Sequence, residues 1–398
     1  MNKTLILQKI KDLNVCVLIP TYNNERTLKR VIDGVLQFTN SVIIVNDGST
    51  DSTAQILKNY SQLEQIHVPE NKGKGNALRV GFKKATALGY EYAITIDSDG
   101  QHFPEDIPVF IEALEQVEHK NLLLIGARNM EQEGVPGKSS FGNKFSNFWF
   151  WVETGIKLTD TQSGFRLYPL KALDKLKFYT NKFEFEIEAI VKAAWNDVVV
   201  KNVPIQVLYD ESERVSHFRP FKDFTRISIL NTCLIVILLF YIIPRNLFRK
   251  LKKKGVKRFF VEDFLGSQDS PTKKALSIAL GVFIGLSPFW GFHTVIVLFL
   301  ALVLRLNKAI AFAFSNVSLP PFIPFVLYAS SKMGQFILGI DYNYTLDMFK
   351  NGFEITDHLK TYIIGSFSLA IVSALVFGFI GFLFFSIFEK KNAALQNG

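Results

Sequence analysis

Short apolar runs alternate with amphipathic stretches along the first 225 residues of the chain. Four runs have strand length and are almost free of polar side chains: 15–19, 42–45, 92–96 and 122–125. Such runs are typical of parallel strands that are covered on both faces. Between them, residues 28–36 and, less cleanly, 77–85 repeat apolar side chains at helical spacing. This order predicts an α/β domain with a mostly parallel sheet, in which ligands gather at the carboxyl ends of the strands.

The pattern changes near residue 226 to long apolar segments. These segments are 227–243, 275–306, 309–330 and 362–388. Their length predicts a membrane region. The alternative is the buried core of a soluble protein, but the last segment is too long for an ordinary helix of such a core. We therefore expect an α/β domain at 1–225, an interfacial or membrane helix with a basic linker at 226–268, and a helical transmembrane domain at 269–398.

The orientation of these segments follows from charge. Eight Lys and Arg residues lie within 245–258, and the positive-inside rule places them in the cytoplasm. Residues 1–12 lack the features of a secretory signal, so the N-terminal domain is expected there too. Residues 227–243 are then expected to lie at the interface or to dip in and return. The alternative, four spans with the basic loop outside, breaks the charge rule.

The remaining segments complete this expected topology. The Pro–Trp–Gly break at 288–291 is expected to form a re-entrant turn, 309–330 to cross outward, and the last helix to return.

Composition narrows the class of protein. Of 398 residues, 48% are hydrophobic, which excludes a disordered chain, and the net charge is +9. A basic balance fits anionic lipid, a phosphorylated substrate or nucleic acid. Apolar segments flank the basic run 245–258, so an anionic-lipid tether is favoured over nucleic acid. Two cysteines, Cys16 and Cys233, allow neither a disulfide framework nor a Cys-based zinc site.

Polar motifs follow the predicted strands in order. They are 19–24 (IPTYNN), 45–51 (VNDGSTD), 71–76 (NKGKGN), 97–101 (DSDGQ) and 160–166 (DTQSGFR). In the fourth, strand alternation would put Asp97 and Asp99 on the same side, where they repel unless a cation lies between them. Such oxygen ligands suit Mg²⁺ or Mn²⁺, and Gln101 would add a neutral oxygen. The alternative is two solvated aspartates in a turn.

Two other motifs fit a nucleotide but also have plain structural interpretations. Asp47 is suited to bind a base or ribose, or it belongs to a turn that precedes a helix cap. The glycines of 71–76 with Lys72 and Lys74 are suited to approach phosphates, or they form a turn with solvated lysines.

This ordered set resembles the family 2 glycosyltransferases of the GT-A fold, and most closely the polyprenyl-phosphate branch, over residues 13–225. The resemblance implies that Asp97, Asp99 and Gln101 hold Mg²⁺ or Mn²⁺ on the diphosphate of a nucleotide-sugar donor. It implies these donor contacts: Pro20, Tyr22, Asn24, Asp47, Lys74, Asp97, Arg214 and Ser216. Asn24 stands where many relatives have Glu, which leaves the choice between uridine and guanosine open. The segment 214–217 (RVSH) resembles the loop that closes over the diphosphate.

The same resemblance identifies an acceptor side. Residues 126–128 (GAR) resemble the Gly-Ser-Arg segment whose arginine binds the lipid phosphate, which implies this role for Arg128. Lys144 falls near a second basic position, and Ser163 lies in the D-x-x-S-G-F-R match. The alternative for Arg128 and Lys144 is a basic surface that faces anionic lipid.

The expected catalytic residues are Asp99, Arg128 and Asp160. A phosphate acceptor is mostly ionised at neutral pH, because the second pKa of a phosphate monoester is about 6, and it needs no strong base. A hydroxyl acceptor needs one, and Asp160 is then the candidate. Direct attack would invert the anomeric centre. The chain has no Q-x-x-R-W motif, which favours a single transfer over polymer growth.

The C-terminal part, over about 270–340, resembles a bacterial membrane domain of unknown function that is often fused to such transferases. We therefore expect a multi-pass enzyme of the bacterial inner membrane with its catalytic domain in the cytoplasm. It would move one sugar from a GDP-mannose or UDP-glucose type donor to polyprenyl phosphate. A glycolipid hydroxyl in envelope polysaccharide or lipopolysaccharide assembly is the alternative acceptor. Anionic lipids are expected partners, nucleic acid is not, and a homo-oligomer is left open.

A third interpretation is a lipid transporter or scaffold with a degenerate transferase domain. The intact Asp97–Asp99 pair and Arg128 argue against it.

Overall fold

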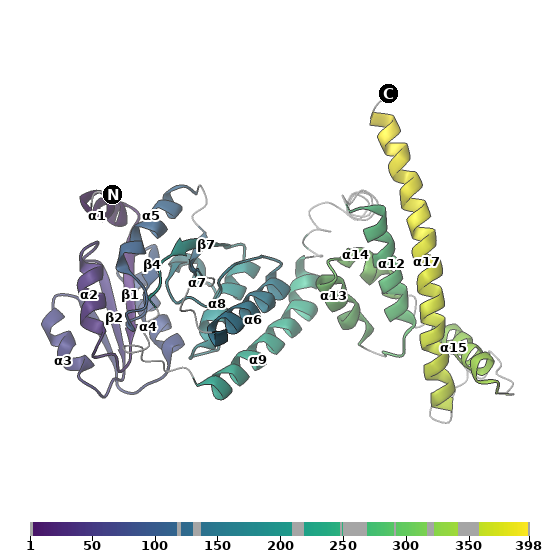
Figure 1. Cartoon of the computed structure of the whole chain (residues 1–398), viewed down its shortest axis with the longest axis horizontal. Coiled ribbons are helices and arrows are strands. Elements are labelled where there is room, and N and C mark those ends of the chain that lie inside the picture. Colours follow the sequence, from purple (N-terminus) through teal and green to yellow (C-terminus); the bar gives the residue numbers. More distant parts are fainter. Residues whose placement is uncertain are drawn as a thin grey trace. The chain divides into compact units, whose positions relative to one another are not determined.

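The computed structural model describes most of the chain. The described residues are 3–117, 121–129, 137–208, 219–246, 249, 269–289, 292–316, 322–340 and 358–396. They form two compact units, Met1–Ile235 and Val236–Gly398. The division falls within a helix that begins at Pro220. Figure 1 shows the elements of each unit.

The first unit is built on a seven-stranded sheet in the order β3-β2-β1-β4-β6-β5-β7. The strands are β1 (Val15–Thr21), β2 (Val42–Asp47), β3 (Glu64–Val68), β4 (Tyr92–Thr95), β5 (Leu122–Arg128), β6 (Arg166–Pro169) and β7 (Val199–Ile205). Within these strands β6 runs antiparallel to β4 and β5, and the other pairs are parallel. The expected mostly parallel sheet is confirmed, and the four apolar runs of the sequence are β1, β2, β4 and β5.

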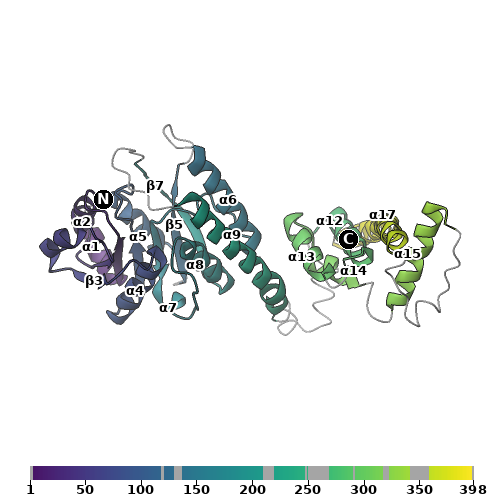
Figure 2. The same ribbon diagram turned by 90° about the horizontal axis from the view of Figure 1, so that it is seen from below.

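Helices cover both faces of this sheet (Figures 1 and 2). The helices up to residue 237 are α1 (Lys3–Asp12), α2 (Leu28–Leu36), α3 (Thr53–Leu57), α4 (Lys74–Ala87), α5 (Ile107–Glu115), α6 (Gly137–Thr154), α7 (Leu170–Leu173), α8 (Glu184–Trp195) and α9 (Pro220–Ile237). Short 3₁₀ turns are η1 (Lys58–Tyr60) and η2 (Pro104–Asp106). Alternate strand residues face α1, α2 and α5 on one side and α4, α7 and α8 on the other.

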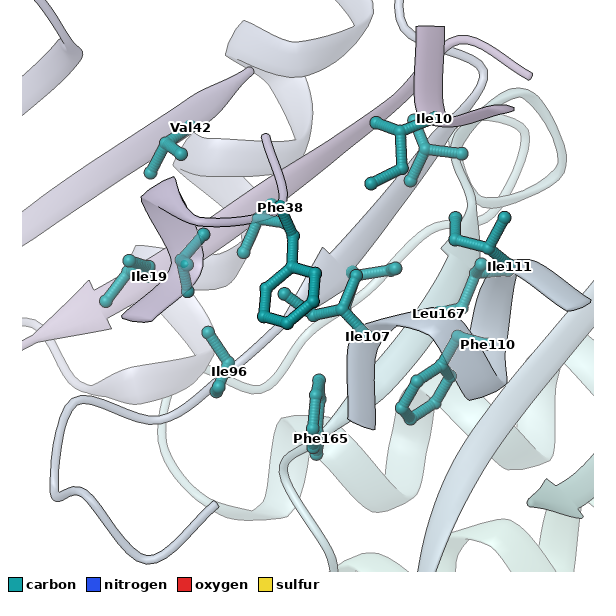
Figure 3. Packing of buried hydrophobic residues seen from close by; sticks show 14 of the residues in the cluster. Ile10, Ile19, Phe38, Val42, Ile96, Ile107, Phe110, Ile111, Phe165 and Leu167 are labelled. Carbon is teal, nitrogen blue, oxygen red and sulfur yellow. The ribbon is translucent and has the colours of Figure 1, made fainter. Parts of the chain in front are cut away.

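The larger hydrophobic core fills the space between the sheet and the first group of helices (Figure 3). Phe165 lies in it just before β6, with its ring 4.7 Å from that of Phe110 on α5. Both side chains are fully buried. The core therefore extends to the segment 160–166, and packing at Phe165 fixes the backbone that carries the polar residues of that motif.

The second unit is helical. After the π-helical turn η3 (Leu238–Ile242) it contains α12 (Pro271–Leu286), α13 (His293–Val303), α14 (Lys308–Ser315), α15 (Ile323–Leu338) and α17 (Leu359–Gln396). Two described helices are long and apolar enough to cross a membrane, Phe221–Asn246 and Leu359–Ile387. Only 33% and 22% of their most apolar windows are buried. Core helices of soluble proteins are mostly buried, so these surfaces suit a lipid environment.

The other two apolar segments, 275–306 and 309–330, do not form single continuous helices. Residues 275–306 divide between α12 and α13, as the Pro–Trp–Gly break predicted. Residues 309–330 were expected to cross as one segment, but they divide between α14 and α15. Prolines explain the division, because a proline has no backbone N–H to donate within a helix, and Pro324 stands in the first turn of α15.

Side-chain contacts define how the helices of the second unit run. Lys274 near the start of α12 lies over the ring of Phe385 near the end of α17, and Phe289 beyond the end of α12 contacts Phe367. α12 and α17 are therefore antiparallel. The helix α15 is also antiparallel to α17, because Ser330 lies against Gly365 and Gly334 against Thr361. A side chain at Gly365 would overlap the backbone of α15, so these two helices approach closely only because glycine stands there.

We predict that Phe165→Ala lowers the free energy of unfolding by about 3–5 kcal/mol, because it leaves a cavity beside Phe110. Phe165→Leu should cost less, since it fills more of the same space. Thermal and denaturant unfolding of the purified chain measure both effects. Equal stability of the alanine variant and the original chain would contradict the packing described for this position.

Candidate active site

The ends of β1 and β4 meet through a buried hydrogen-bond network. The Ser98 hydroxyl donates to the carbonyl of Pro20 (3.1 Å) and accepts from Asn24 Nδ2 (2.7 Å). The hydroxyl of Thr27 donates to the Ser98 carbonyl (2.6 Å). Asn24 thus braces the middle residue of the Asp97–Asp99 motif, and Tyr22 lies half-buried beside it. The motifs at 19–24 and 97–101 therefore form one structure, as their positions in the sequence indicated.

The end of β2 holds the glycine loop. Asp47 is buried, and its two carboxylate oxygens accept backbone N–H groups of Lys72 (3.1 Å) and Gly73 (2.7 Å). Gly73 has φ = +102°, a conformation that favours glycine. Burial raises the pKa of Asp47, and the two N–H groups oppose that effect. In this structure Asp47 fixes the loop from which α4 begins.

Lys74, at the start of α4, lies between two carboxylates. Its Nζ is 2.7 Å from Asp97 Oδ1 and 3.0 Å from Glu186 Oε2 on α8. Burial disfavours the ammonium ion, but Asp97 and Glu186 outweigh burial and raise the pKa of Lys74. For Asp97 burial again opposes ionisation, and the positive charges of Lys74 and Arg166 lower its pKa in spite of it. Both partners are therefore charged at neutral pH.

The segment 160–166 passes close to this ion pair at Gly164. A Cβ built on Gly164 would overlap Asp97 Oδ2 and lie 2.7 Å from Lys74 Nζ. The neighbouring Arg166 is fully buried, and its guanidinium donates to the carbonyls of Thr161, Ser163 and Glu186. The S-G-F-R part of the motif is thus a tightly packed support for the ion pair.

Arg128, at the end of β5, is held by Asp160. Its Nε is 2.7 Å from Asp160 Oδ2 and its Nη2 is 3.1 Å from Oδ1. The Asp160 carboxylate also accepts Arg128 N, Asn143 Nδ2, Gln162 N and Ser163 N, so it accepts six hydrogen bonds in all. Burial would raise its pKa, but Arg128 and these N–H groups lower it. Asp160 is fully buried, which makes it a support for Arg128 rather than an accessible base.

Two further residues of the expected acceptor side lie close by in the chain. Ser163 is buried, and its hydroxyl accepts from the backbone N–H of Phe165. Lys144 is exposed on α6, next to Asn143, which contacts Asp160. Residues 209–218, which include the expected donor contacts Arg214 and Ser216, lie outside the described part of the chain.

Asp99 and Gln101 lie beyond the end of β4, which stops at Thr95. Strand alternation was expected to put Asp97 and Asp99 on one side. This reasoning was wrong, because Asp99 is not in a strand but in a turn that Gly100 closes with φ = +73°. Asp99 Oδ1 accepts the backbone N–H of Gln101 (3.0 Å). The buried amide nitrogen of Gln101 has no hydrogen-bond partner among the described residues.

The residues at this turn fit a divalent metal only in part. No cluster of three or more His, Cys, Asp and Glu side chains exists within the described ranges. Asp97 is occupied by Lys74, which leaves the Asp99 carboxylate and the Gln101 amide oxygen as hard ligands. Mg²⁺ and Mn²⁺ are commonly bound by one or two such groups, with substrate phosphates and water supplying the rest. The residues present thus fit a metal that arrives with a phosphorylated substrate.

Three residues of the site were not expected from the sequence. Glu186 and Asn143 complete the Lys74 and Arg128 clusters, and burial lowers the pKa of His102 to about 4, so its imidazole is neutral at pH 7. Only Glu186 had a visible signal. It belongs to 184–188 (EFEIE), where three acids alternate with apolar residues. Acids that become buried in this way need partners.

Comparisons with known proteins place the chain in a family. Residues 16–177 match "Glycosyl transferase family 2", and residues 256–394 match "Uncharacterized protein conserved in bacteria (DUF2062)". The chain is 31% identical over 222 residues to the UDP-N-acetylglucosamine–dolichyl-phosphate N-acetylglucosaminyltransferase of Methanococcus voltae, covering 50% of this chain and 88% of the relative. The chain therefore belongs to the family 2 glycosyltransferases, and its first unit is a GT-A-like domain.

The names of other relatives also describe sugar transfer to a lipid phosphate. The undecaprenyl-phosphate mannosyltransferase of Micrococcus luteus is 26% identical, over 48% of this chain and 83% of that protein. The human dolichyl-phosphate beta-glucosyltransferase is 26% identical, over 51% and 69%. Among solved structures, glucosyl-3-phosphoglycerate synthase of Mycobacterium tuberculosis with Mn²⁺, uridine diphosphate and glucosyl-3-phosphoglycerate matches with a TM-score of 0.46 and 18% identity, covering 60% of this chain and 84% of that one.

We predict that Asp160→Asn lowers the free energy of unfolding by about 3–5 kcal/mol, because it leaves Arg128 partly buried without its counter-charge. The pKa of Asp160 is lower in the folded than in the unfolded chain. Its stabilising effect is therefore complete above the unfolded value of about 3.9 and is lost as the pH falls through the folded value. The asparagine variant should lose less stability on acidification. Thermal unfolding against pH measures this, with exposed Asp174→Asn as the control.

Proposed function

We propose that the chain transfers a single sugar from a nucleotide-sugar donor to polyprenyl phosphate at the cytoplasmic leaflet of a bacterial membrane. The observation that carries the choice of acceptor is the state of the carboxylates at the edge of the sheet. Asp160 is saturated by hydrogen bonds and held ionised by Arg128, while Asp97 and Glu186 share Lys74. These three groups are poorly suited to take a proton from a hydroxyl. A phosphate acceptor does not require that step, because it is already ionised.

Arg128 supports the same choice. Asp160 fixes its guanidinium at the carboxyl end of β5, where it would bind the acceptor phosphate. The exposed Lys144 adds a second positive charge on the neighbouring helix α6. Because none of these three described carboxylates is accessible as a base, a glycolipid hydroxyl is the weaker acceptor.

On the donor side, Asp99 and Gln101 would hold Mg²⁺ or Mn²⁺, which when bound supplies positive charge that stabilises the departing diphosphate. Pro20, Tyr22 and Asp47 lie on the elements that would receive the nucleoside, and the glycine loop approaches the phosphates. The acceptor oxygen forms its bond to the anomeric carbon as the bond to the diphosphate oxygen breaks. Attack from the opposite face inverts the anomeric centre.

The contacts of the second unit support a membrane topology. Asn307 N donates to Ser277 Oγ and Asn307 Nδ2 to Asp269 (both 2.8 Å), so α13 returns to the level at which α12 began. This end of the helices carries Lys273, Lys274, Arg305 and Lys308, and Phe385 of α17 lies against Lys274 there. The positive-inside rule places this end in the cytoplasm. α12 and α13 then form a re-entrant hairpin, α14 and α15 lead outward, and α17 returns.

We predict that Asp99→Ala lowers sugar transfer to a short polyprenyl phosphate by about 100- to 1000-fold, because stabilisation of the leaving diphosphate is lost. EDTA should have a similar effect on the original chain, and added Mg²⁺ or Mn²⁺ should reverse it. Purified membranes with radiolabelled UDP- and GDP-sugars provide the assay, and exposed Asp174→Ala is the matched control. Normal transfer by the Asp99 variant would show that the site is wrongly assigned.

A second prediction tests the topology in a Cys233→Ser background, which removes the exposed native thiol. In intact cells, a membrane-impermeant maleimide should label Ile340→Cys at the outer end of α15 and should leave Lys308→Cys unlabelled. Lys308→Cys should react once the membrane is permeabilised. The reverse pattern would contradict the proposed orientation.

A further inference from the structure

We propose that Lys74 is the resident counter-cation of Asp97, and that a divalent metal therefore enters this site only together with a nucleoside diphosphate. This inference rests on the proposed function for the identity of the donor. It goes beyond that function because it assigns Lys74 and Glu186 as positioning residues. It also assigns different tasks to the two acids of the Asp97–Asp99 motif.

The ammonium group of Lys74 lies between the carboxylates of Asp97 and Glu186, in a position that a metal cation would otherwise occupy. Its Nζ lies 2.7 Å and 3.0 Å from the two oxygens of Asp97, and 3.0 Å from Glu186 Oε2. Only 17% of the Lys74 side chain, 21% of Asp97 and 9% of Glu186 are exposed. Both oxygens of Asp97 are thus engaged by a positive charge that belongs to the chain itself.

The surroundings hold Lys74 in place. Arg166 donates to the backbone carbonyl of Glu186 (2.8 Å), and its Nη2 is 3.9 Å from Glu186 Oε1. The backbone N–H of Asn76 on α4 donates to the carbonyl of Asn181 just before α8 (2.8 Å), which ties the helices of the two partners together. Gly164 lies so close to the pair that a side chain there would require the Asp97 carboxylate or the Lys74 ammonium group to move. The ion pair is therefore built into the packing of the site.

The charges of this cluster are balanced. Lys74 and Arg166 carry two positive charges, and Asp97 and Glu186 carry two negative charges. A dication that approached Asp97 would meet no excess negative charge and would have to displace the ammonium group. Asp99 and Gln101 alone offer one carboxylate and one amide, too few ligands for firm binding. The diphosphate of a nucleotide supplies the missing oxygens and charge.

Mn²⁺ binding to the purified full-length chain tests this inference, with free Mn²⁺ measured by electron paramagnetic resonance. The original chain should bind Mn²⁺ at least about tenfold more tightly with UDP or GDP present than without a nucleotide, because the diphosphate supplies charged oxygen ligands. Equally tight binding with and without nucleotide would overturn the inference.

The Mn²⁺ affinities of two variants distinguish the effect of Lys74 from that of Glu186. Lys74→Met combined with Glu186→Gln removes one charge of each sign, so the net charge of the cluster is unchanged. Asp97 is then available, and Mn²⁺ affinity without nucleotide should rise by about tenfold. Glu186→Gln alone leaves Lys74 on Asp97, and its affinity should stay within about twofold of the original chain. An unchanged affinity in the double variant, with folding verified by circular dichroism, would also overturn the inference.

The same experiment distinguishes this inference from the proposed function. The Mn²⁺ pattern depends only on the nucleotide and on the cluster, so it does not require an acceptor. If the pattern holds but polyprenyl phosphate accepts no sugar, the proposed acceptor is wrong and the role of Lys74 stands. If transfer proceeds but the double variant binds Mn²⁺ as the original chain does, the role of Lys74 is wrong.

Discussion

Buried charges must be paired, and this constraint organises the carboxyl edge of the sheet. Asp160 is ionised in a fully buried position because the Arg128 guanidinium and four N–H groups donate to it, and Asp97 is ionised because Lys74 lies against it. Each pair also joins elements that are distant in the chain. The pairs therefore fix the backbone of 160–166 and the start of α4 at the same time, and they leave the edge with ordered positive groups that suit two phosphorylated substrates.

Much of the fold follows from the sequence because burial leaves a direct signal. The strands β1, β2, β4 and β5 are covered on both faces, so each appears as a continuous apolar run. β3, β6 and β7 were missed for different reasons. β3 is half-buried at the edge, β6 has four residues and runs antiparallel, and β7 mixes buried with exposed positions. In the second unit, length and hydropathy gave the apolar segments but not the division of 309–330 between α14 and α15.

The candidate site could be located but not assembled from the sequence. The motifs at strand ends identified Asp97, Arg128 and Asp160 because parallel strands bring their carboxyl ends to one edge. Their partners were hidden, because the contact of Lys74 with Glu186 depends on the approach of α4 to α8, which no local pattern encodes. For the same reason the sequence alone leaves Asp160 as the candidate base for a hydroxyl acceptor. Only the structure shows that its oxygens are already occupied by hydrogen bonds.

The central claim is that the acceptor is an anion which needs no base. The most direct measurement compares undecaprenyl phosphate with the uncharged alcohol undecaprenol as acceptors. Both are placed in the same liposomes with the full-length chain, a radiolabelled nucleotide-sugar and Mg²⁺. The account predicts a glycolipid product from the phosphate and none from the alcohol. Transfer to the alcohol at a comparable rate, or to neither lipid with any UDP- or GDP-sugar, would contradict it.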